Sequence, residues 1–257
     1  MRRLIVNVAF GEHYLKGQRR LQAACDALKE PLVTHSGLMR GWPSHAQKPY
    51  AFKACALALH SASTDLIMWM DAAVKPVRPL EPLWERIERE GYWFAENAWN
   101  NYQWTADSAY PDLFPNSFTD TEDGNMCFDL EQARGFNKEI PQVMACAFGL
   151  NLRNEIGNAF LLDYMHLAMT DAFRGPWWNS NNPVNRGKDP AKCAPCGPPD
   201  VIGHRHDQTA ASVIAWRLDM KLTPGHREQN GDYLVYPEWF GGRVPPGALM
   251  VHDGSMK

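Results

Sequence analysis

Short apolar runs alternate with stretches of helical periodicity through the first half of the chain. Residues 4–10 are rich in branched side chains, and residues 66–70 form an unbroken apolar run that ends at Asp71. Both runs indicate strands, and the second is typical of a central parallel strand buried on two sides. A helix with one buried face is indicated by the spacing of Phe52, Cys55, Ala56 and Leu59. The alternation predicts an α/β protein.

The same patterns predict the remaining elements. Residues 11–28, 154–173 and those from 207 onward have helical periodicity, and Lys53 lies off the apolar face of the helix around residues 52–59. Further strands are expected at residues 31–34, 92–95 and 144–150, and a last apolar run follows at residues 248–251. We therefore expect one domain over residues 1–257, with a mixed, mainly parallel central sheet flanked by helices.

Two segments lack periodicity. Residues 174–203 gather Pro, Gly, Asn and Trp, including the pair Trp177 and Trp178, and predict a long loop. Long loops in compact domains are often functional. Residues 237–257 form a tail rich in Gly and Pro around the last apolar run.

Composition limits the classes of function. The 257 residues are 45% hydrophobic and 21% charged, with a formal net charge of -3, so no global positive field attracts nucleic acid or anionic lipid. No apolar run is long enough to cross a bilayer, and the six cysteines do not have the spacing of a disulfide framework. These features predict a cytoplasmic protein with reduced thiols.

Asp71 is the first candidate for chemistry. It follows a buried strand directly, and open α/β sheets bind their ligands at the carboxyl ends of strands. The alternative is that the carboxylate of Asp71 only caps the turn that follows the strand.

Three segments together carry a family resemblance. They are Lys-Pro-Tyr-Ala-Phe-Lys at residues 48–53, Trp-Met-Asp-Ala-Ala at 69–73, and His-Arg-His-Asp-Gln at 204–208. Their order and context resemble nucleotide-sugar-dependent glycosyltransferases of the GT-A fold, particularly bacterial and phage relatives. The resemblance spans most of the chain, and the His-Arg-His-Asp-Gln segment is its most specific part.

The resemblance implies a cation site. GT-A enzymes use an Asp-x-Asp pair to hold the donor and a Mn²⁺ or Mg²⁺ ion that bridges the donor's diphosphate. Asp71 matches the first carboxylate, but Ala73 replaces the second. His252 resembles the C-terminal metal-binding His of these enzymes, and Lys257 the Lys that reaches the diphosphate, although their spacing is one residue short of the glycogenin-like pattern. Lys53 and Arg19 are further candidates for contact with the donor.

The segment around Asp207 resembles retaining families. Blood-group-type galactosyltransferases have His-Asp-Glu at the corresponding helix start, and glycogenin-like families have Asp-Gln. By this resemblance His206 and Asp207 bind the donor and Gln208 faces the reacting carbon. An amide is a poor nucleophile, so a front-face displacement with retention is favoured over a covalent intermediate. Without the resemblance, Asp207 reads as a residue that stabilises a helix N-terminus.

Two other groups have a candidate role and a plainer alternative. Trp177 and Trp178 are expected to line an acceptor cleft, since sugars stack on indole faces, although most tryptophans only pack. Cys193 and Cys196, with His204 and His206, have ligand types suited to structural zinc, but a single Cys pair favours a plain loop.

The sequence therefore predicts a glycosyltransferase that moves a hexosyl or pentosyl group from a nucleotide diphosphate sugar, a UDP-sugar by preference, to a hydroxyl acceptor. A glycan is the default acceptor. The alternatives are a phage enzyme that acts on a hydroxymethylated pyrimidine in DNA, and a non-catalytic module that binds sugar nucleotides or glycans. A zinc-dependent hydrolase would leave Asp71 unexplained.

Overall fold

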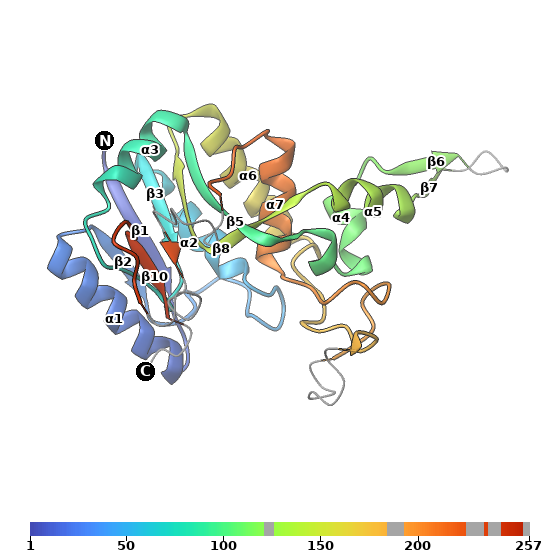
Figure 1. Ribbon diagram of the computed structural model, residues 1–257, viewed down its shortest axis with the longest axis horizontal. Helices are drawn as coiled ribbons and strands as arrows, with labels where there is room; N and C mark the ends of the chain where they lie inside the picture. Colours follow the sequence, from blue (N-terminus) through green and yellow to red (C-terminus); the bar gives the residue numbers. More distant parts are fainter. Residues whose placement is uncertain (121–125, 184–192, 225–233, 236–242, 254–257) are drawn as a thin grey trace.

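A computed structural model describes residues 1–120, 126–183, 193–224, 234–235 and 243–253. Its centre is a five-stranded sheet with the order β2-β1-β3-β8-β5 (Figure 1). The strands are β1 (Arg3–Val8), β2 (Leu32–His35), β3 (Leu66–Met70), β5 (Tyr92–Asn100) and β8 (Pro141–Asn151). Only β8 of these five runs opposite to the others, so β3 has a parallel neighbour in β1 and an antiparallel one in β8. The fold is mixed α/β with a mainly parallel sheet.

Helices cover both faces of this sheet because its strands are apolar on both sides. In β3, Ile67 and Trp69 point to one core while Leu66, Met68 and Met70 point to the other. The first core lies under α2 (Ala51–Ser61), α6 (Glu155–Met169) and α7 (Asp207–Arg217). The second lies under α1 (Glu12–Leu28), α3 (Glu81–Glu90) and a small sheet of β4 (Val74–Pro76), β10 (Met250–His252) and β9 (Leu234–Val235).

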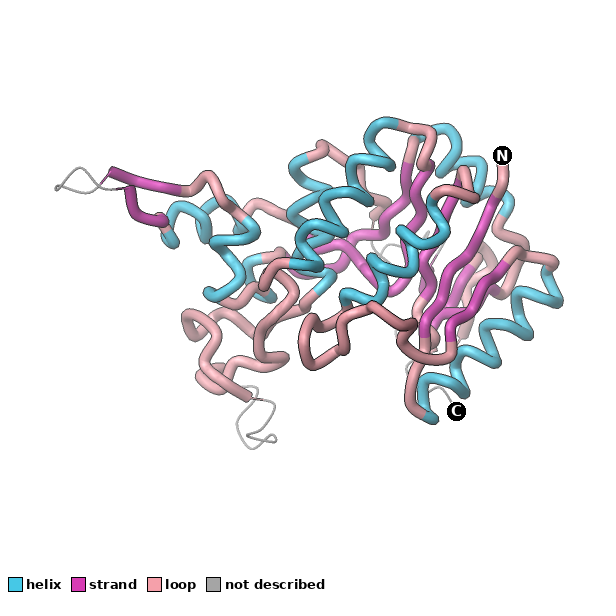
Figure 2. Tube along the Cα trace, turned by 180° about the vertical axis from the view of Figure 1, so that it is seen from behind, coloured by secondary structure: helices cyan, strands magenta, loops and turns pink. Residues whose placement is uncertain are grey.

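An arm leaves the body between β5 and β8. It contains the 3₁₀ turns η1 (Tyr102–Trp104) and η2 (Asp107–Ala109), the helices α4 (Tyr110–Leu113) and α5 (Leu130–Lys138), and a hairpin of β6 (Phe118–Asp120) and β7 (Met126–Phe128). Figures 1 and 2 show the hairpin projecting away from the sheet. These elements lack the strong periodicity that marked the body in the sequence.

The segment 174–203 is a loop over its described residues, apart from one isolated bridge between Trp178 and Cys193. The buried amide of Asn179 organises it by donating to the carbonyls of Pro198 and Val201 at 3.0 Å each. Gly203 passes so close to Trp177 that a Cβ there would lie 2.0 Å from the Trp177 carbonyl oxygen. The loop is thereby held against the start of α7. No helix of the described residues is long and apolar enough to cross a membrane.

Candidate active site

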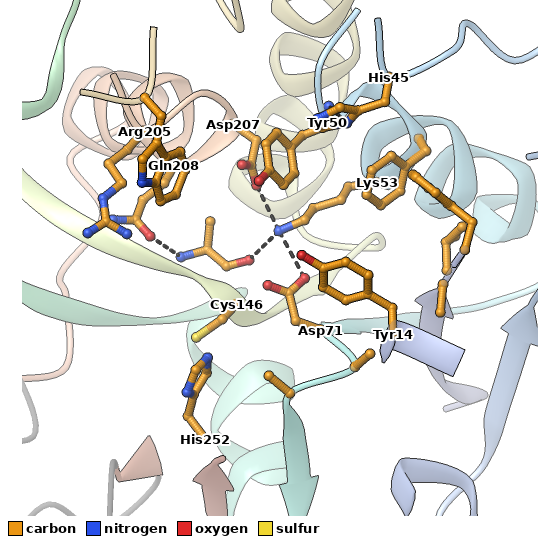
Figure 3. Close-up of a pocket in the computed structure, with 18 residues that line it drawn as sticks. Tyr14, His45, Tyr50, Lys53, Asp71, Cys146, Arg205, Asp207, Gln208 and His252 are labelled. Carbon is orange, nitrogen blue, oxygen red and sulfur yellow. Dashed lines mark hydrogen bonds and ion pairs between the residues drawn. The ribbon is translucent and has the colours of Figure 1, made fainter. Parts of the chain in front are cut away.

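A cavity of about 470 Å³ opens at the carboxyl end of β1 and β3 (Figure 3). The loop after β3 supplies Asp71, α2 supplies Lys53, and α7 supplies Asp207. Asp71 and Asp207 are far apart in the sequence and meet here. The cavity therefore combines the three segments that the sequence singled out.

Lys53 joins the two carboxylates. Its Nζ lies 3.0 Å from Oδ1 of Asp71 and 2.9 Å from Oδ2 of Asp207, and it donates to the carbonyl of Ala145 at 3.1 Å. These contacts use all three N–H groups of the ammonium. The expectation that Lys53 lies off the buried face of α2 is wrong, because its side chain is buried and only 3% of the residue is exposed. A burial of this depth is possible because the charge is paired.

The carboxylates have further partners. Trp69 donates its Nε1–H to Oδ1 of Asp71 at 2.7 Å, and the Tyr164 hydroxyl donates to Oδ2 of Asp207 at 3.3 Å. Oδ2 of Asp71 makes no hydrogen bond to any residue in the described part of the chain. One carboxylate oxygen of Asp71 therefore remains available to a ligand.

Electrostatics hold the lysine of this cluster in its charged form. Burial alone would lower the pKa of Lys53, but Asp207 and Asp71 together outweigh it and raise the pKa, so the ammonium is retained. Burial raises the pKa of Asp207, and the nearby Asp71 adds to the effect while Lys53 opposes it. Two carboxyl groups thus share one ammonium at the floor of the cavity.

Both helices that supply the cluster begin with an aromatic residue of positive φ. Tyr50 precedes α2 with φ 59°, and His206 precedes α7 with φ 50°. Their rings stack at 5.2 Å, and Trp177 stacks on the other side at 5.5 Å from His206. Such backbone values are costly for non-glycine residues and persist where packing enforces them, often at functional sites. The stack aligns the first turns of the two helices.

The two histidines before α7 act as neutral hydrogen-bonding groups. His204 accepts from the backbone N–H of Ala106 through Nδ1 and donates from Nε2 to the carbonyl of Ala172, each at 3.1 Å. His206 donates from Nδ1 to the carbonyl of Phe173 at 2.9 Å. Burial lowers the pKa of His204 to about 3 and that of His206 to about 4. His206 is thus a buried support behind the cavity wall.

Gln208 and Arg205 line one side of the cavity together with Trp177. The backbone N–H of Ala145 donates to Oε1 of Gln208 at 3.4 Å, which orients the amide. The Arg205 guanidinium lies over two indoles, 4.1 Å from the ring centre of Trp104 and 4.9 Å from that of Trp177. Figure 3 shows Arg205 and Gln208 on one side of Lys53 and Tyr14 on the other.

The residues near Asp71 fit part of a cation site. His252 and Ala73 both line the cavity, because β10 pairs with β4 and places His252 opposite Val74. Asp253 fixes this end through an ion pair with Arg20 at 2.5 Å. Among the described residues no three His, Cys, Asp or Glu side chains lie close enough to hold a metal ion by themselves. Asp71 and His252 could hold a Mg²⁺ or Mn²⁺ ion only with phosphate oxygens of a substrate, a common arrangement for Mg²⁺.

Some expected site residues are not in the cavity. Arg19 is exposed on α1, turned away from its buried face of Gln18, Leu21 and Cys25. Trp178 packs beside Trp104 and Trp177 but does not line the cavity. Lys257 lies outside the described residues.

The candidate zinc ligands are also engaged elsewhere. His204 uses both ring nitrogens within the protein. Burial raises the pKa of the Cys196 thiol to about 12, which disfavours the thiolate that zinc binds.

Several lining residues escaped the sequence analysis. Tyr14, Tyr50, Cys146 and Arg205 line the cavity, and Tyr164 supports Asp207 from α6. Tyr50 and Arg205 lie inside the singled-out segments, so their position beside Lys53 and Asp207 was an available signal. Tyr164 carried no such signal, because a Tyr on the apolar side of a helix resembles ordinary core.

Comparisons with known proteins bear on the fold. No protein-family model matches the chain, and no curated protein matches it. A solved glycosyltransferase involved in the glycosylation of the major capsid of PBCV-1 aligns over 98% of this chain and 93% of its own, with TM-score 0.52 and 10% identity. The fold is that of a GT-A glycosyltransferase. This likeness concerns the fold and does not carry the activity over.

Two other similar structures are more distant. Mouse xyloside xylosyltransferase 1 has 10% identity, covers 99% of this chain and 98% of its own, and has TM-score 0.44. The galactosyltransferase LgtC in complex with donor and acceptor sugar analogs has 14% identity, covers 93% of this chain and 100% of its own, and has TM-score 0.34.

Proposed function

We propose that this protein transfers a hexosyl or pentosyl group from a nucleotide diphosphate sugar, a UDP-sugar by preference, to a hydroxyl acceptor. The observation that carries the proposal is the meeting of Asp71 and Asp207 at the buried ammonium of Lys53, in a cavity at the carboxyl ends of β1 and β3. Ligands of open α/β folds bind at such strand ends. A cavity of about 470 Å³ suits a ligand of sugar-nucleotide size.

The carboxyl groups of the cavity floor support a divalent cation in this reaction. A diphosphate that binds beside Asp71 and Asp207 needs a counter-charge of its own, because the ammonium of Lys53 is already paired with these two groups. Asp71, through its available oxygen, and His252 would hold Mn²⁺ or Mg²⁺ together with the donor's phosphates. The ion would stabilise charge on the leaving diphosphate. In this proposal Lys53 acts through the two carboxylates rather than by contact with the diphosphate, because its three N–H groups are used within the protein.

The chain's own residues would organise the transfer. Asp207 is held by Lys53 and Tyr164 and would bind hydroxyls of the donor sugar. Gln208 would face the anomeric carbon. In a front-face displacement the bond from that carbon to the diphosphate oxygen breaks, the acceptor oxygen bonds to the same carbon, and the acceptor's proton passes to the diphosphate. The configuration at the carbon is then retained.

A glycan is the acceptor we favour. DNA would require a concentrated basic patch. The N-terminal part of the sequence offers one cluster of five basic residues, Arg2, Arg3, Lys16, Arg19 and Arg20. Four of the five pair with carboxylates, which reduces their field: Arg2 with Asp65, Arg3 with Glu81, Lys16 with Glu12, and Arg20 with Asp253.

The test is release of nucleoside diphosphate from a panel of sugar nucleotides, with Mn²⁺, with Mg²⁺ and with EDTA. Transferases of this kind slowly hydrolyse their donor without an acceptor. We expect hydrolysis of at least one UDP-sugar, lost in EDTA, and reduced by about 100-fold or more in Asp71→Asn and by about 10-fold or more in Gln208→Ala. Asp26→Asn is the matched control, because Asp26 is exposed on α1.

The outcomes separate the hypotheses. No release from any sugar nucleotide, combined with a thermal shift by UDP, would favour a non-catalytic binding module. Release that Gln208→Ala leaves unchanged would contradict the role given to Gln208. Thermal melting of each variant shows whether it is folded.

A further inference from the structure

Two histidines outside the cavity meet where the end of β2 lies beside the end of α2. His35 is the last residue of β2, and His60 lies in the last turn of α2. Their Nε2 atoms are 3.0 Å apart, and their ring centres are 5.3 Å apart with 29° between the ring planes. Neither residue lines the cavity, and the proposed function gives neither of them a role.

The contact between the rings shows that at least one imidazole is neutral. A neutral imidazole donates from one ring nitrogen and accepts at the other, whereas an imidazolium donates from both. A hydrogen bond between the two Nε2 atoms therefore requires a lone pair on one of them. A neutral imidazole with a free lone pair is the form that binds metal ions.

The separation of the two nitrogens also fits a single metal ion. An imidazole nitrogen lies about 2.0–2.1 Å from a bound Zn²⁺ ion, so two such ligands are about 2.9 Å apart at a right angle and about 3.3 Å apart at the tetrahedral angle. The observed 3.0 Å between the Nε2 atoms falls in this range. An ion can therefore take the place of the shared proton through rotations of the two rings, with the backbone left in place.

The backbone that carries His35 is well fixed. In the register of β1 and β2, His35 lies opposite Val8. Its carbonyl accepts from the backbone N–H of Ala9 at 2.9 Å and from Nε2 of the buried Gln18 at 3.1 Å. Its ring packs edge-on against Trp42, with the ring centres 5.7 Å apart. Ligands on rigid elements lose little conformational freedom when they bind an ion.

The surroundings of His60 favour a cation of a particular class. The last turn of α2 carries the negative end of the helix dipole, where positive charge is stabilised. Both rings are half-buried, so solvent and ions reach them. Among the described residues no three His, Cys, Asp or Glu side chains come together to hold an ion, so two imidazoles are the protein's contribution and water completes the coordination. Imidazole ligands suit Zn²⁺ and Ni²⁺, whereas Mg²⁺ and Ca²⁺ prefer oxygen.

We propose that His35 and His60 form a transition-metal site, separate from the cavity, in which both Nε2 atoms bind one Zn²⁺ or Ni²⁺ ion. The ion would join the end of β2 to the end of α2. It would stabilise the folded protein, because the unfolded chain does not hold the two rings together. This proposal does not depend on the proposed function, and either can fail while the other stands.

Isothermal titration calorimetry with NiCl₂, and then with ZnCl₂, tests the site. NiCl₂ is the first probe because imidazole suits Ni²⁺, whereas the thiolates of free cysteines favour Zn²⁺. We expect the wild-type protein to bind Ni²⁺ at a site whose affinity falls by about tenfold or more in His35→Gln and in His60→Gln. A glutamine still forms a hydrogen bond with the remaining imidazole but does not replace the lost nitrogen ligand.

Two controls locate the site. His166→Gln is the matched control, because His166 also lies in the last turn of a helix, α6, but is exposed and separate from the pair. Asp71→Asn distinguishes the pair from the candidate cation site of the cavity. Both variants should keep the wild-type affinity for Ni²⁺. Thermal melting is a second readout, since NiCl₂ should raise the melting temperature of the wild type and of both controls more than that of either histidine-pair variant.

Each other outcome overturns the proposal. Affinities for Ni²⁺ within about twofold of wild type in both His35→Gln and His60→Gln would mean an adventitious ion only. Loss of the binding in Asp71→Asn would assign the ion to the cavity, and no binding by the wild type would leave the two histidines as a hydrogen-bonded pair alone. If neither variant folds, electron paramagnetic resonance of the wild type with equimolar Cu²⁺ decides, because fewer than two nitrogen ligands would contradict the site.

Discussion

Lys53 organises the candidate site through its contacts within the chain. Its ammonium has three acceptors within about 3.1 Å, and its side chain is buried. Two carboxylates that both lie about 3 Å from the same ammonium would repel each other without it. The lysine therefore holds Asp71 and Asp207 together, and its removal should reveal their repulsion.

Replacing Lys53 with Met should lower the free energy of unfolding by about 3–5 kcal/mol at pH 7.5, the range found when a buried ion pair loses one partner. In the variant the folded state raises the pKa of the remaining carboxyl cluster. The destabilisation should therefore shrink as the pH falls from 7.5 to 5.5, because the folded state takes up a proton more readily than the unfolded chain. Urea denaturation at both pH values measures this.

Lys16→Met is the control for that variant, since Lys16 is exposed and, among the described residues, pairs with Glu12 one turn away. Its free energy of unfolding should change by less than about 1 kcal/mol. A Lys53→Met effect of that small size would show that the cluster tolerates two unpaired carboxylates. A larger effect without pH dependence would show that the carboxylates of the folded variant do not take up a proton.

The histidines before α7 predict a second pH effect, with the opposite sign. Their folded pKa values, about 3 for His204 and about 4 for His206, lie below the ordinary 6.5. The unfolded chain then binds protons that the folded protein rejects, so stability falls as the pH drops below 6.5. Each histidine contributes at most about 1.4 kcal/mol per pH unit, and its slope is largest between pH 6 and 4.5.

The slope of unfolding free energy against pH checks this. In His204→Asn this slope should decrease by about half of the combined contribution of His204 and His206. In His13→Asn, where the side chain is exposed, the slope should stay unchanged. Equal slopes in wild type and His204→Asn would mean that His204 is protonated or accessible in the folded protein.

At the scale of elements, the site depends on two helix starts and one close contact between loops. Tyr50 and His206 place the first turns of α2 and α7 side by side, and the loop before α7 packs on the segment around Trp177. This contact requires a residue without a side chain at position 203, where a Cβ would meet the Trp177 carbonyl oxygen at 2.0 Å.

Gly203→Ala should accordingly destabilise the protein by about 1–3 kcal/mol, because backbone must shift to admit the methyl group. Gly135→Ala is the matched control, since nothing lies within 4 Å of a Cβ there, and it should be neutral or stabilising by up to about 1 kcal/mol because Gly135 is in a helix. Chemical denaturation compares them. Equal free energies of unfolding for Gly203→Ala and Gly135→Ala would show that the loop admits the methyl group without destabilising the protein.

The elements of the body were largely predictable, and those of the arm were not. Residues 66–70 gave β3 correctly because a strand buried on both faces is apolar at every position. The strand β8 was expected at residues 144–150, but its antiparallel direction was not, since its apolar run resembles that of a parallel strand. In the site, Asp71 followed from its place after β3, whereas the burial of Lys53 did not, because periodicity cannot foresee two carboxylates from distant segments. The contact of Tyr164 with Asp207 could not be predicted either, because the two residues come from distant segments of the chain.

At the scale of the whole molecule, the hairpin of the arm differs from the sheet of the body in how much apolar surface it buries. The sheet buries apolar residues on both faces, whereas the hairpin of β6 and β7 exposes Phe118 and Met126. A lone two-stranded hairpin contributes little stability of its own. The fold of the body should therefore not require it.

Replacing residues 118–128 with a short Gly-Ser linker should change the melting temperature by less than about 3 °C, which corresponds to under about 1 kcal/mol in a chain of this size. Differential scanning calorimetry of the two proteins measures this. A fall beyond about 6 °C would mean that the hairpin supports the body.

The ion cluster around Lys53 also bears on how quickly a ligand can be received. Because Lys53 orients both carboxylates through contacts within the chain, an incoming molecule meets a template that needs little rearrangement. Specificity for one ligand over another then depends on the residues of the cavity rim and walls, whose shape and charge can vary while the floor stays constant. A scaffold of this kind could change its preferred ligand through substitutions in the cavity wall alone.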